Sequence, residues 1–325
     1  MSKSSKIGVV VIGRNEGERL LRCLASIPDW IKHVVYVDSG STDESCASAL
    51  ATGATVHELD LSKPFTAARA RNEGLETLLS DAALDYVQFI DGDCEFRDGW
   101  IEAAVTFLQD HPEVAVACGR RRERYPERSV FNRLCDWEWD TPVGKAQACG
   151  GDAMMRVDAL QQVGGYNPSL IAGEEPELCV RFRAKGWSIW RLNHEMTWHD
   201  VAMTRLGQWW KRNRRAGYAY AEGADMHGAP PERHGVREVR RALLWTMFPI
   251  AVILISLLFN PLLLLALLVF PAQVMRLTKR DQRTGREAFE RACFLTFAKW
   301  PEAHGIIEYK LRKLFGRRRQ IIEYK

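Results

Sequence analysis

The sequence predicts an α/β fold with a mostly parallel central sheet and flanking helices, followed by a C-terminal α-helical membrane hairpin. In the first half of the chain, short apolar runs rich in Val and Ile alternate with helical patterns. This alternation is typical of parallel strands joined by crossover helices. Further on, residues 242–275 contain no charged side chain, and this run is longer than the roughly 20 residues that one membrane-spanning helix needs.

The alternating pattern places the elements of the sheet in order. Strands are expected at 7–12, 33–37, 55–59, 86–90 and 114–118, and helices at 16–27, 43–51, 66–79 and 100–109. The next part of the chain is less regular, with a basic loop expected at 120–128, a helix at 176–185 and an aromatic, basic helix at 205–222.

Length and composition indicate one catalytic domain with an appendage. We expect a catalytic domain over residues 1–225, a linker rich in Gly, Pro and His over 226–241, the hydrophobic hairpin over 242–275 and a basic amphipathic tail over 276–325. The chain carries a net charge of +4, and the excess positive charge lies in the tail. Beside a membrane segment, such a tail favours contact with lipid headgroups. A protein docking site is the alternative, and nucleic acid comes third because no recognition motif accompanies the charge.

The uncharged run is divided by Asn260 and Pro261, which predicts two arms. Positive residues flank both outer ends, so the positive-inside rule favours a hairpin with both ends on the cytoplasmic side. Each arm is short for a complete crossing, so a re-entrant hairpin and two full spans both remain open, and a buried helix pair of a soluble protein is the third alternative. The flanking cations are Arg237, Arg240, Arg241, Arg276, Lys279 and Arg280.

Polar residues follow three of the expected strands, at the sheet edge where open α/β sheets bind ligands. Asp91-Gly92-Asp93 comes directly after the apolar run 86–90. Paired carboxylates are ligands for Mg²⁺ or Mn²⁺, which commonly bridge to substrate phosphates. An acidic turn after a strand is also common without a metal, so it is the position after a buried strand that favours a metal site.

The ends of the other strands suggest a nucleotide pocket. Asn15 and Glu16 follow the first strand, and Asp38 ends the second, just before a serine- and threonine-rich helix start. Asp38 is a candidate acceptor for a nucleotide base, and Arg71 in the next helix is a candidate contact for the donor. An ordinary strand-turn-helix junction is the alternative for the segment 38–43.

Six motifs in order resemble the family 2 glycosyltransferases, which have the GT-A fold. These motifs are VVIGRNEGERL, VDSGSTDES, ARARNEG, FIDGDCEF, ACGGDAMMRV and GEEPELCVRFRAKGW. The resemblance covers roughly residues 7–222 and is greatest to bacterial members that build surface or extracellular polysaccharides. It implies a nucleotide-diphosphate sugar donor, a divalent metal (Mn²⁺ or Mg²⁺), inversion at the anomeric carbon, and a lipid-linked or membrane-proximal acceptor at the cytoplasmic face of the inner membrane.

The resemblance also implies roles for individual residues. Glu175 would be the general base, although Glu replaces the usual Asp at this point and leaves Glu174 as a rival. The two glutamates could instead simply form the negative first turn of a helix. The remaining assignments are Asn15, Glu16, Asp38, Arg71, Asp91, Gly92 and Arg215 for the donor, Asp93, Asp91 and His199 for the metal, and Gly150, Gly151 and Asp152 for the acceptor region.

Two other functions remain open at this point. A sugar nucleotidyltransferase also uses metal-binding aspartates on an α/β sheet, but it should carry a Gly- and Arg/Lys-rich loop after its first strand, which Arg14-Asn15-Glu16-Gly17 does not provide. A non-enzymatic scaffold of a polysaccharide assembly complex would not require Asp38, Asp91, Asp93 and Glu175 together. Because one hairpin offers little material for a channel, we expect transfer of single sugars and not processive synthesis.

Overall fold

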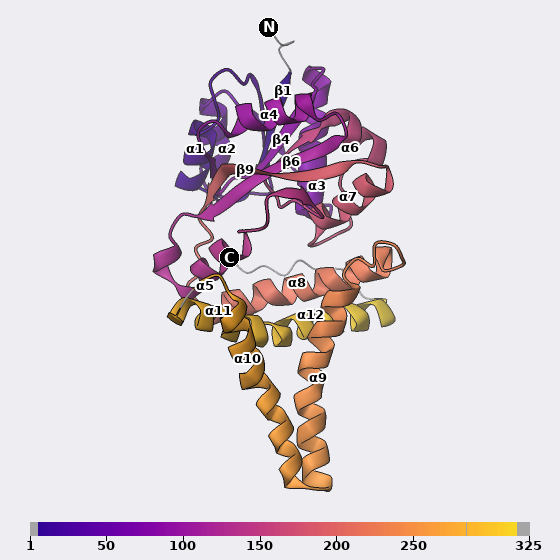
Figure 1. Ribbon diagram of the computed structural model, residues 1–325. Helices are drawn as coiled ribbons and strands as arrows, with labels where there is room; N and C mark the ends of the chain where they lie inside the picture. The colour runs from indigo at the N-terminus through magenta and orange to yellow at the C-terminus, as the bar shows by residue number, and fades with distance from the viewer. Residues whose placement is uncertain (1–5, 284, 317–325) are drawn as a thin grey trace. The chain divides into compact units, whose positions relative to one another are not determined.

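The computed structural model describes residues 6–283 and 285–316 of the chain. It divides into two compact units, Met1–Thr204 and Arg205–Lys325 (Figure 1). The first unit is built on a mixed sheet with flanking helices, and the second consists of helices alone.

The sheet of the first unit has nine strands in the order β3-β2-β1-β4-β8-β6-β9-β5, and β7 pairs with β9. The pairs β1–β2, β2–β3, β1–β4 and β6–β9 are parallel, and the other pairs are antiparallel. The strands are β1 (Ile7–Gly13), β2 (His33–Asp38), β3 (Thr55–Glu58), β4 (Tyr86–Asp91), β5 (Cys94–Phe96), β6 (Val114–Glu123), β7 (Gly144–Ala146), β8 (Ala153–Arg156) and β9 (Ser188–His199).

Helices cover both faces of this sheet, as Figure 1 shows. Gly74 of α3 packs against Val10 on one face, whereas Trp100 of α4 donates a hydrogen bond to Gln88 of β4 on the other. The helices are α1 (Glu18–Ala25), α2 (Ser45–Ala51), α3 (Ala67–Asp81), α4 (Trp100–Asp110), the short 3-10 helix η1 (Pro126–Arg128), α5 (Val130–Glu138), α6 (Val157–Val163) and α7 (Glu174–Ala184). The predicted α/β architecture is confirmed.

The strand register brings the predicted site residues to one edge. Gly13 of β1 lies opposite Asp38 of β2, and Ile12 lies opposite Asp91 of β4. The carboxyl ends of these three neighbouring parallel strands therefore lie together, as the ligand-binding edge of an open α/β sheet requires. The antiparallel strand β8 begins at this same edge, because Ala153 pairs with Phe89.

Two segments differ from the sequence-based expectation. The expected basic loop at 120–128 begins as strand, because β6 continues to Glu123 and pairs with the end of β9. The helix expected to begin at Pro176 begins two residues earlier, at Glu174, with Gly173 before it in the left-handed conformation (φ 77°). That position favours glycine, which has no Cβ to clash.

The second unit contains a two-armed hairpin and a helical layer, seen in Figure 1. Its elements are α8 (Leu206–His227), α9 (Val236–Leu258), the 3-10 helix η2 (Pro261–Leu268), α10 (Val269–Arg280), α11 (Gly285–Phe297) and α12 (Lys299–Leu314). The predicted break falls at Asn260, whose side chain accepts a hydrogen bond from the Leu262 N–H at the start of η2.

The helical layer of the second unit is held by close packing of α8 on α12. A Cβ atom at Gly217 or at Gly305 would overlap the backbone of the partner helix, so these two glycines permit the approach. Arg214 Nε lies 2.7 Å from Glu308 Oε2 across the same contact. The predicted domain boundary at residue 225 falls inside α8, and the compact units divide at Thr204 instead. The rest of the predicted tail, residues 317–325, lies outside the described residues.

Candidate active site

Arg71 joins the end of β4 to the start of α7. Its Nη2 lies 2.9 Å from Asp91 Oδ1, and its Nη1 lies 3.0 Å from Glu174 Oε1 and 2.9 Å from Glu175 Oε1. The Arg71 side chain is only 3% exposed. Burial opposes its charge, but Glu175 and Asp91 raise the pKa of Arg71 well above its usual value, so it stays charged. The structure thus brings Arg71, Asp91 and both candidate bases together, although more than a hundred residues separate Arg71 from Glu174.

Gly151 leaves the space that this ion pair occupies. A Cβ atom at Gly151 would lie 2.7 Å from Arg71 Nη2 and 2.9 Å from Asp91 Oδ2. At the neighbouring Gly150, which is exposed, a Cβ atom would meet nothing within 4 Å. Of the two predicted acceptor-region glycines, Gly151 is therefore required by the packing of charged groups.

Glu175 has the environment of a group that exchanges protons near neutral pH. Burial, which has the largest effect, and the neighbouring Glu174 raise the pKa of Glu175 to about 7, while Arg71 acts in the opposite direction. Its side chain keeps 13% of its surface exposed, compared with 5% for Glu174. Glu175 is therefore the more accessible of the two carboxylates, and a pKa near the working pH suits a general base.

Asp152 lies in the protein interior and is hydrogen-bonded to neighbouring residues of the site. Its carboxylate accepts hydrogen bonds from Arg121 Nε (2.9 Å) and from Thr197 Oγ1 (2.7 Å), and it also accepts one from the backbone N–H of Asp91. The Asp152 side chain has no exposed surface. In this structure it positions Asp91 and Arg121, and its predicted role in the acceptor region stays a prediction.

Arg121 is a site residue that the sequence analysis missed. Its Nη2 lies 2.8 Å from Asp152 Oδ1 and 3.5 Å from Asp91 Oδ2, and its guanidinium lies 5.4 Å from the centre of the Trp139 ring. The available indication was the period of two along a strand, which points Arg121 and Glu123 to one side of β6. The consecutive basic residues of this segment, which were expected to form a loop, hide that alternation.

A second group of ligand-type side chains lies next to the first. Asp93 Oδ2 lies 3.4 Å from His199 Nε2, and both side chains are buried. Ligand atoms of Asp93, Cys94 and His199 all lie within 4.8 Å of one another. His199 reaches this place because it ends β9 and pairs with Cys94 of β5, and its other ring nitrogen lies 3.8 Å from Glu123 Oε2.

The donor set of this group fits a hard divalent cation. The carboxylate suits Mg²⁺ or Mn²⁺, the imidazole adds a nitrogen donor of the kind that transition-metal ions accept, and further positions are left to substrate oxygens. Burial raises the pKa of the Cys94 thiol well above its usual value, so it stays protonated and is a poor ligand. Asp91 belongs to a different group, with Cys94 and Asp152, into which Arg121 places its charge. The structure therefore brings Asp93 and His199 together as candidate ligands and places Asp91 against the arginines.

The predicted nucleotide pocket is a compact turn. The Asp38 carboxylate accepts hydrogen bonds from Tyr36 Oη, from Ser41 Oγ and from the backbone N–H groups of Gly40 and Ser41. Burial opposes its ionisation, but the bonds from Ser41, Tyr36 and Gly40 together lower the pKa of Asp38. These four bonds occupy the lone pairs of the carboxylate, so Asp38 shapes the turn, and its contact with a base stays a prediction.

Asn15 and Glu16 connect this turn to Asp91-Gly92-Asp93. Asn15 accepts a hydrogen bond from the Thr42 N–H through its side-chain oxygen (2.7 Å). A Cβ atom at Gly92 would lie 3.3 Å from Glu16 Cγ and from the Ile12 carbonyl, so this glycine permits the close packing of the two strand ends. Arg215 lies in the second unit, half-buried on α8, and its donor contact stays a prediction.

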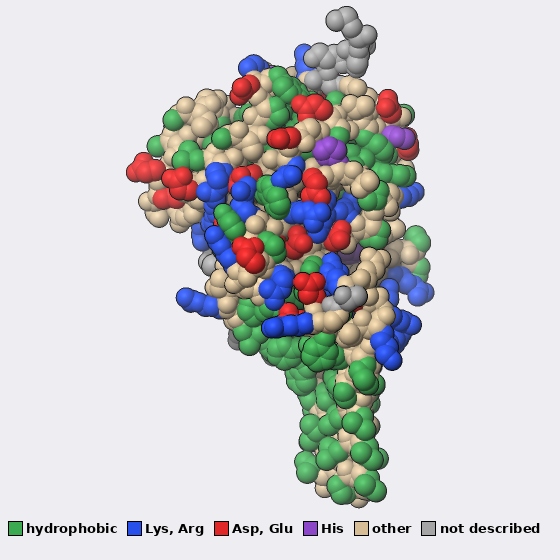
Figure 2. Space-filling model, turned by 60° about the vertical axis from the view of Figure 1, so that its left-hand side comes forward, with side chains coloured by type: hydrophobic (Ala, Val, Ile, Leu, Met, Phe, Trp, Pro, Cys, Tyr) green, Lys and Arg blue, Asp and Glu red, His purple; other side chains and the backbone are tan. Residues whose placement is uncertain are grey.

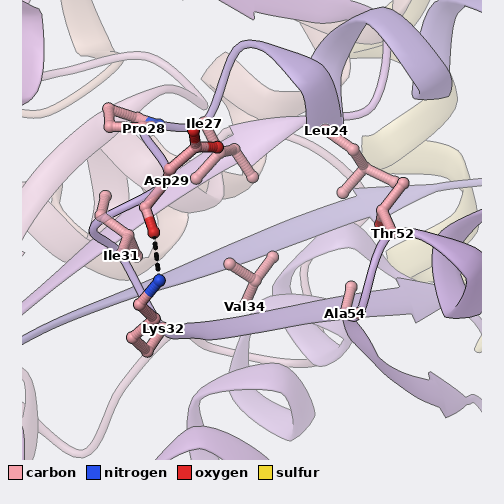
Figure 3. Close-up of a pocket in the computed structure, with 10 residues that line it drawn as sticks. Leu24, Ile27, Pro28, Asp29, Ile31, Lys32, Val34, Thr52 and Ala54 are labelled. Carbon is pink, nitrogen blue, oxygen red and sulfur yellow. Dashed lines mark hydrogen bonds between the residues drawn. The ribbon is translucent and has the colours of Figure 1, made fainter.

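A separate hollow lies at the opposite edge of the sheet. It measures about 400 Å³ and is shown in Figure 3, with Lys32 donating a hydrogen bond to the Asp29 carbonyl. Lys32 precedes β2 and Ala54 precedes β3, so this hollow lies at the amino ends of the strands. Ligands of open α/β sheets bind at the carboxyl ends, and the charged groups described above all lie there. The lining residues include Leu24, Ile27, Pro28, Ile31, Val34 and Thr52.

Comparison with known sequences identifies the family. Residues 8–163, which contain β1 to β4, Asp91 and Asp152, match the family described as Glycosyl transferase family 2. The first unit belongs to glycosyl transferase family 2. Among curated proteins, this chain is 26% identical over 239 residues to the pre-mycofactocin glycosyltransferase of Mycobacterium tuberculosis, covering 68% of this chain and 48% of the relative.

A second curated relative is a TPR repeat-containing protein of Synechococcus elongatus, 30% identical over 131 residues, which covers 40% of this chain and 30% of the relative. The chain thus spans less than half the length of these two curated relatives. The glycosyl transferase family 2 match and the order of elements agree with the predicted fold.

Solved structures show the same fold. The mannosyltransferase PcManGT of Pyrobaculum calidifontis, solved with GDP-Man and Mn²⁺, is 17% identical with a TM-score of 0.56, covering 97% of this chain and 88% of that chain. S. aureus TarS 1-349 is 14% identical with a TM-score of 0.50, covering 96% and 92%. Glucosyl-3-phosphoglycerate synthase of M. tuberculosis, solved with Mn²⁺ and UDP-Glc, is 19% identical with a TM-score of 0.50, covering 70% and 80%. The predicted GT-A fold is confirmed.

Proposed function

We propose that this chain is an inverting, metal-dependent glycosyltransferase, which moves single sugars from a nucleotide-diphosphate sugar to a lipid-linked or membrane-proximal acceptor. The observation that carries the proposal is the contact of one buried arginine, Arg71, with Asp91 on one side and Glu174 and Glu175 on the other. Asp91, which we place beside the donor, therefore shares one ion-pair network with Glu174 and Glu175, which suit an acid–base role. This network lies at the carboxyl ends of the strands.

In this proposal Glu175 acts as the base. It accepts the proton of the acceptor hydroxyl while the hydroxyl oxygen bonds to the anomeric carbon, and the bond from that carbon to the nucleoside diphosphate breaks on the opposite face. Its raised pKa, about 7, means that the ionised and protonated forms are both populated near neutral pH. Glu174, with the smaller exposed surface, contributes negative charge next to it.

Asp93 and His199 are the residues that would hold the metal, Mn²⁺ or Mg²⁺. Their 3.4 Å separation and their burial support this assignment. When bound, such an ion supplies positive charge to the diphosphate of the donor as negative charge develops on it. Arg71 and Arg121 offset part of the negative charge of Asp91 and its neighbouring carboxylates, so an anionic donor at this edge of the sheet would depend on the charge of the metal ion.

The second unit supports action at a membrane. Its two apolar helices, 23 and 20 residues long, meet the length and composition of membrane helices, and large exposed apolar side chains cover them, including Leu257, Leu258, Phe259 and Leu262. Arginine and lysine flank the hairpin at both outer ends. We therefore place the protein at the cytoplasmic face of a bacterial inner membrane, in polysaccharide or glycolipid synthesis.

The proposal is tested with Asp93→Ala in the full chain. Nucleotide sugars are screened for thermal stabilisation of the protein in the presence of Mn²⁺, and release of nucleoside diphosphate is measured for the best donor. We expect Asp93→Ala to lose both Mn²⁺-dependent stabilisation and turnover while its unfolding temperature without ligand stays near that of the parent. Asp98→Ala is the matched control, because Asp98 is an exposed aspartate five positions further along the chain. Unchanged turnover in Asp93→Ala would contradict the metal role.

A further inference from the structure

The tip of the hairpin is built without a polar anchor. Between Thr246 and Val269 the sequence contains no charged residue, no Trp and no Tyr. Phe259 is 80% exposed, and Leu258 is 78% exposed. Membrane segments that emerge from a bilayer carry Trp, Tyr, Lys or Arg at the headgroup level. This tip has none of these residues.

Three backbone N–H groups at the tip are paired within the turn. The Leu262 N–H donates to the Asn260 side-chain oxygen at 2.9 Å, and the Leu263 N–H donates to the Asn260 carbonyl at 3.1 Å. The Phe259 N–H donates to the Ile255 carbonyl, and Pro261 has no N–H. Groups left unsatisfied in hydrocarbon are costly, whereas a turn that emerges into water can leave them to the solvent. These three N–H groups therefore need no partner from the solvent.

The opposite end of the hairpin has the chemistry of an interface. Trp245 of α9 lies edge-to-face on Phe270 of α10, with ring centres 5.3 Å apart. Beyond this pair come Arg240 and Arg241 on α9 and Arg276 on α10. On the face that Figure 2 shows, the lower part of the hairpin has hydrophobic and tan surface and no charged side chain. The polar anchors thus lie at one end only.

Helix α12 crosses α9 where the uncharged run begins. Ala303 and Ile306 of α12 pack on Ala242, and the Thr246 hydroxyl donates a hydrogen bond to the Lys299 carbonyl at 3.0 Å. The outer side of α12 carries an apolar stripe at helical spacing, formed by Ile307, Leu311, Leu314 and Phe315, all of them exposed. An amphipathic helix of this kind lies in the plane of a membrane interface. Helix α12 therefore fixes how deeply the hairpin inserts.

The arms are short when measured from α12. From Ala242 to the end of α9 at Leu258 there are about 17 residues, which reach about 25 Å at 1.5 Å per residue. The hydrocarbon core of a bilayer is about 30 Å thick. With the interface fixed at α12, the tip ends before the far headgroups.

We infer that the hairpin is re-entrant, entering and leaving the membrane by one face, with its tip inside the hydrocarbon core and α12 lying on the near interface. This inference rests on the proposed membrane location. In this arrangement the catalytic unit and both ends of the hairpin lie on the same side of the bilayer.

The test is thiol labelling of Leu262→Cys in the full chain. A membrane-impermeant, charged maleimide is applied to spheroplasts, which expose the far face, to inverted inner-membrane vesicles, which expose the near face, and to detergent-solubilised membranes. We expect labelling of Leu262→Cys in detergent only, at least tenfold above both sealed preparations. Leu257→Cys serves as a second tip position. The parent protein, with its half-buried Cys46 and Cys293, sets the background.

Gln282→Cys is the matched control, because Gln282 is exposed just after α10. It should be labelled in inverted vesicles and not in spheroplasts. Labelling of the tip in spheroplasts would overturn the inference, because it shows that the hairpin spans the bilayer. Labelling of the tip in inverted vesicles, together with release of the protein by carbonate, would instead show that the hairpin lies outside the membrane, and the proposed membrane location would fail with it.

Discussion

Arg71 Nη1 lies 2.9 Å from Glu175 Oε1, so the charge that neutralises the candidate base comes from the helix that follows β3. Burial of the carboxyl group and the neighbouring charge of Glu174 raise the pKa of Glu175, whereas Arg71 lowers it. The balance among these three residues sets the pH at which Glu175 can accept a proton.

Removal of the arginine charge should move the activity profile to higher pH. In Arg71→Met, the effect that lowers the pKa of Glu175 is lost, so the base becomes ionised only at higher pH. We expect the midpoint of the rising limb of kcat against pH to move up from about 7 by about one unit, with reduced turnover at pH 7. Arg71→Lys, which keeps the charge, should bring the midpoint part of the way back toward the parental value. A lower kcat with an unmoved midpoint would show that Arg71 acts by structure alone.

The two glutamates should give opposite results. Glu175→Gln removes the base, so turnover should fall by about 100- to 10,000-fold while donor binding is nearly unchanged. Glu174→Gln removes a like charge next to Glu175, so it should keep turnover and move the midpoint of the pH profile down by about one unit. Steady-state kinetics over pH 5 to 9 and donor titration distinguish the variants. A loss of turnover confined to Glu174→Gln would assign the base to Glu174.

The parts of this site that sequence reasoning found are those with a local pattern. Alternating apolar runs located β1, β2 and β4, so the placement of Asp38 and Asp91 at neighbouring strand ends followed from the parallel topology. The contact of Arg71 with Glu174 joins residues 103 positions apart, and no local pattern encodes it. Arg121 was hidden because β6 continues into a basic run.

Burial also limits what the sequence shows about two carboxylates of the site. Asp38 and Asp152 are almost fully buried and their carboxylates bond to groups of the chain itself, while their predicted contacts with ligands stay predictions. A sequence shows that a carboxylate follows a strand. It does not show whether the turn that follows supplies N–H and hydroxyl donors to that carboxylate. For these residues the direction of the side chain depends on tertiary packing, which the spacing of motifs leaves open.

Adding one methyl group at Gly151 should disturb the Arg71–Asp91 pair. The new Cβ would lie 2.7 Å from Arg71 Nη2, so one of the two charged groups must move. Displacements of about 1 Å in an active site can cost about 100-fold in rate, and we expect Gly151→Ala to lose activity on this scale. Gly150→Ala, where the methyl group meets nothing within 4 Å, should keep parental activity. Equal activity of the two variants would contradict the packing argument.

Loss of the Asp152 carboxylate should lower the stability of the first unit. The side chain has no exposed surface and neutralises Arg121, which would keep only the longer contact with Asp91. Breaking one partner of a buried ion pair costs about 3–5 kcal/mol, so the unfolding temperature of Asp152→Ala, measured in detergent with the full chain, should fall by about 6–20 °C. Asp140→Ala is the control, because Asp140 is 55% exposed and lies 3.5 Å from Arg120, a surface contact expected to contribute about 1 kcal/mol or less. Equal unfolding temperatures for the two variants would mean that Thr197 and the Asp91 backbone hold this edge of the sheet without Asp152.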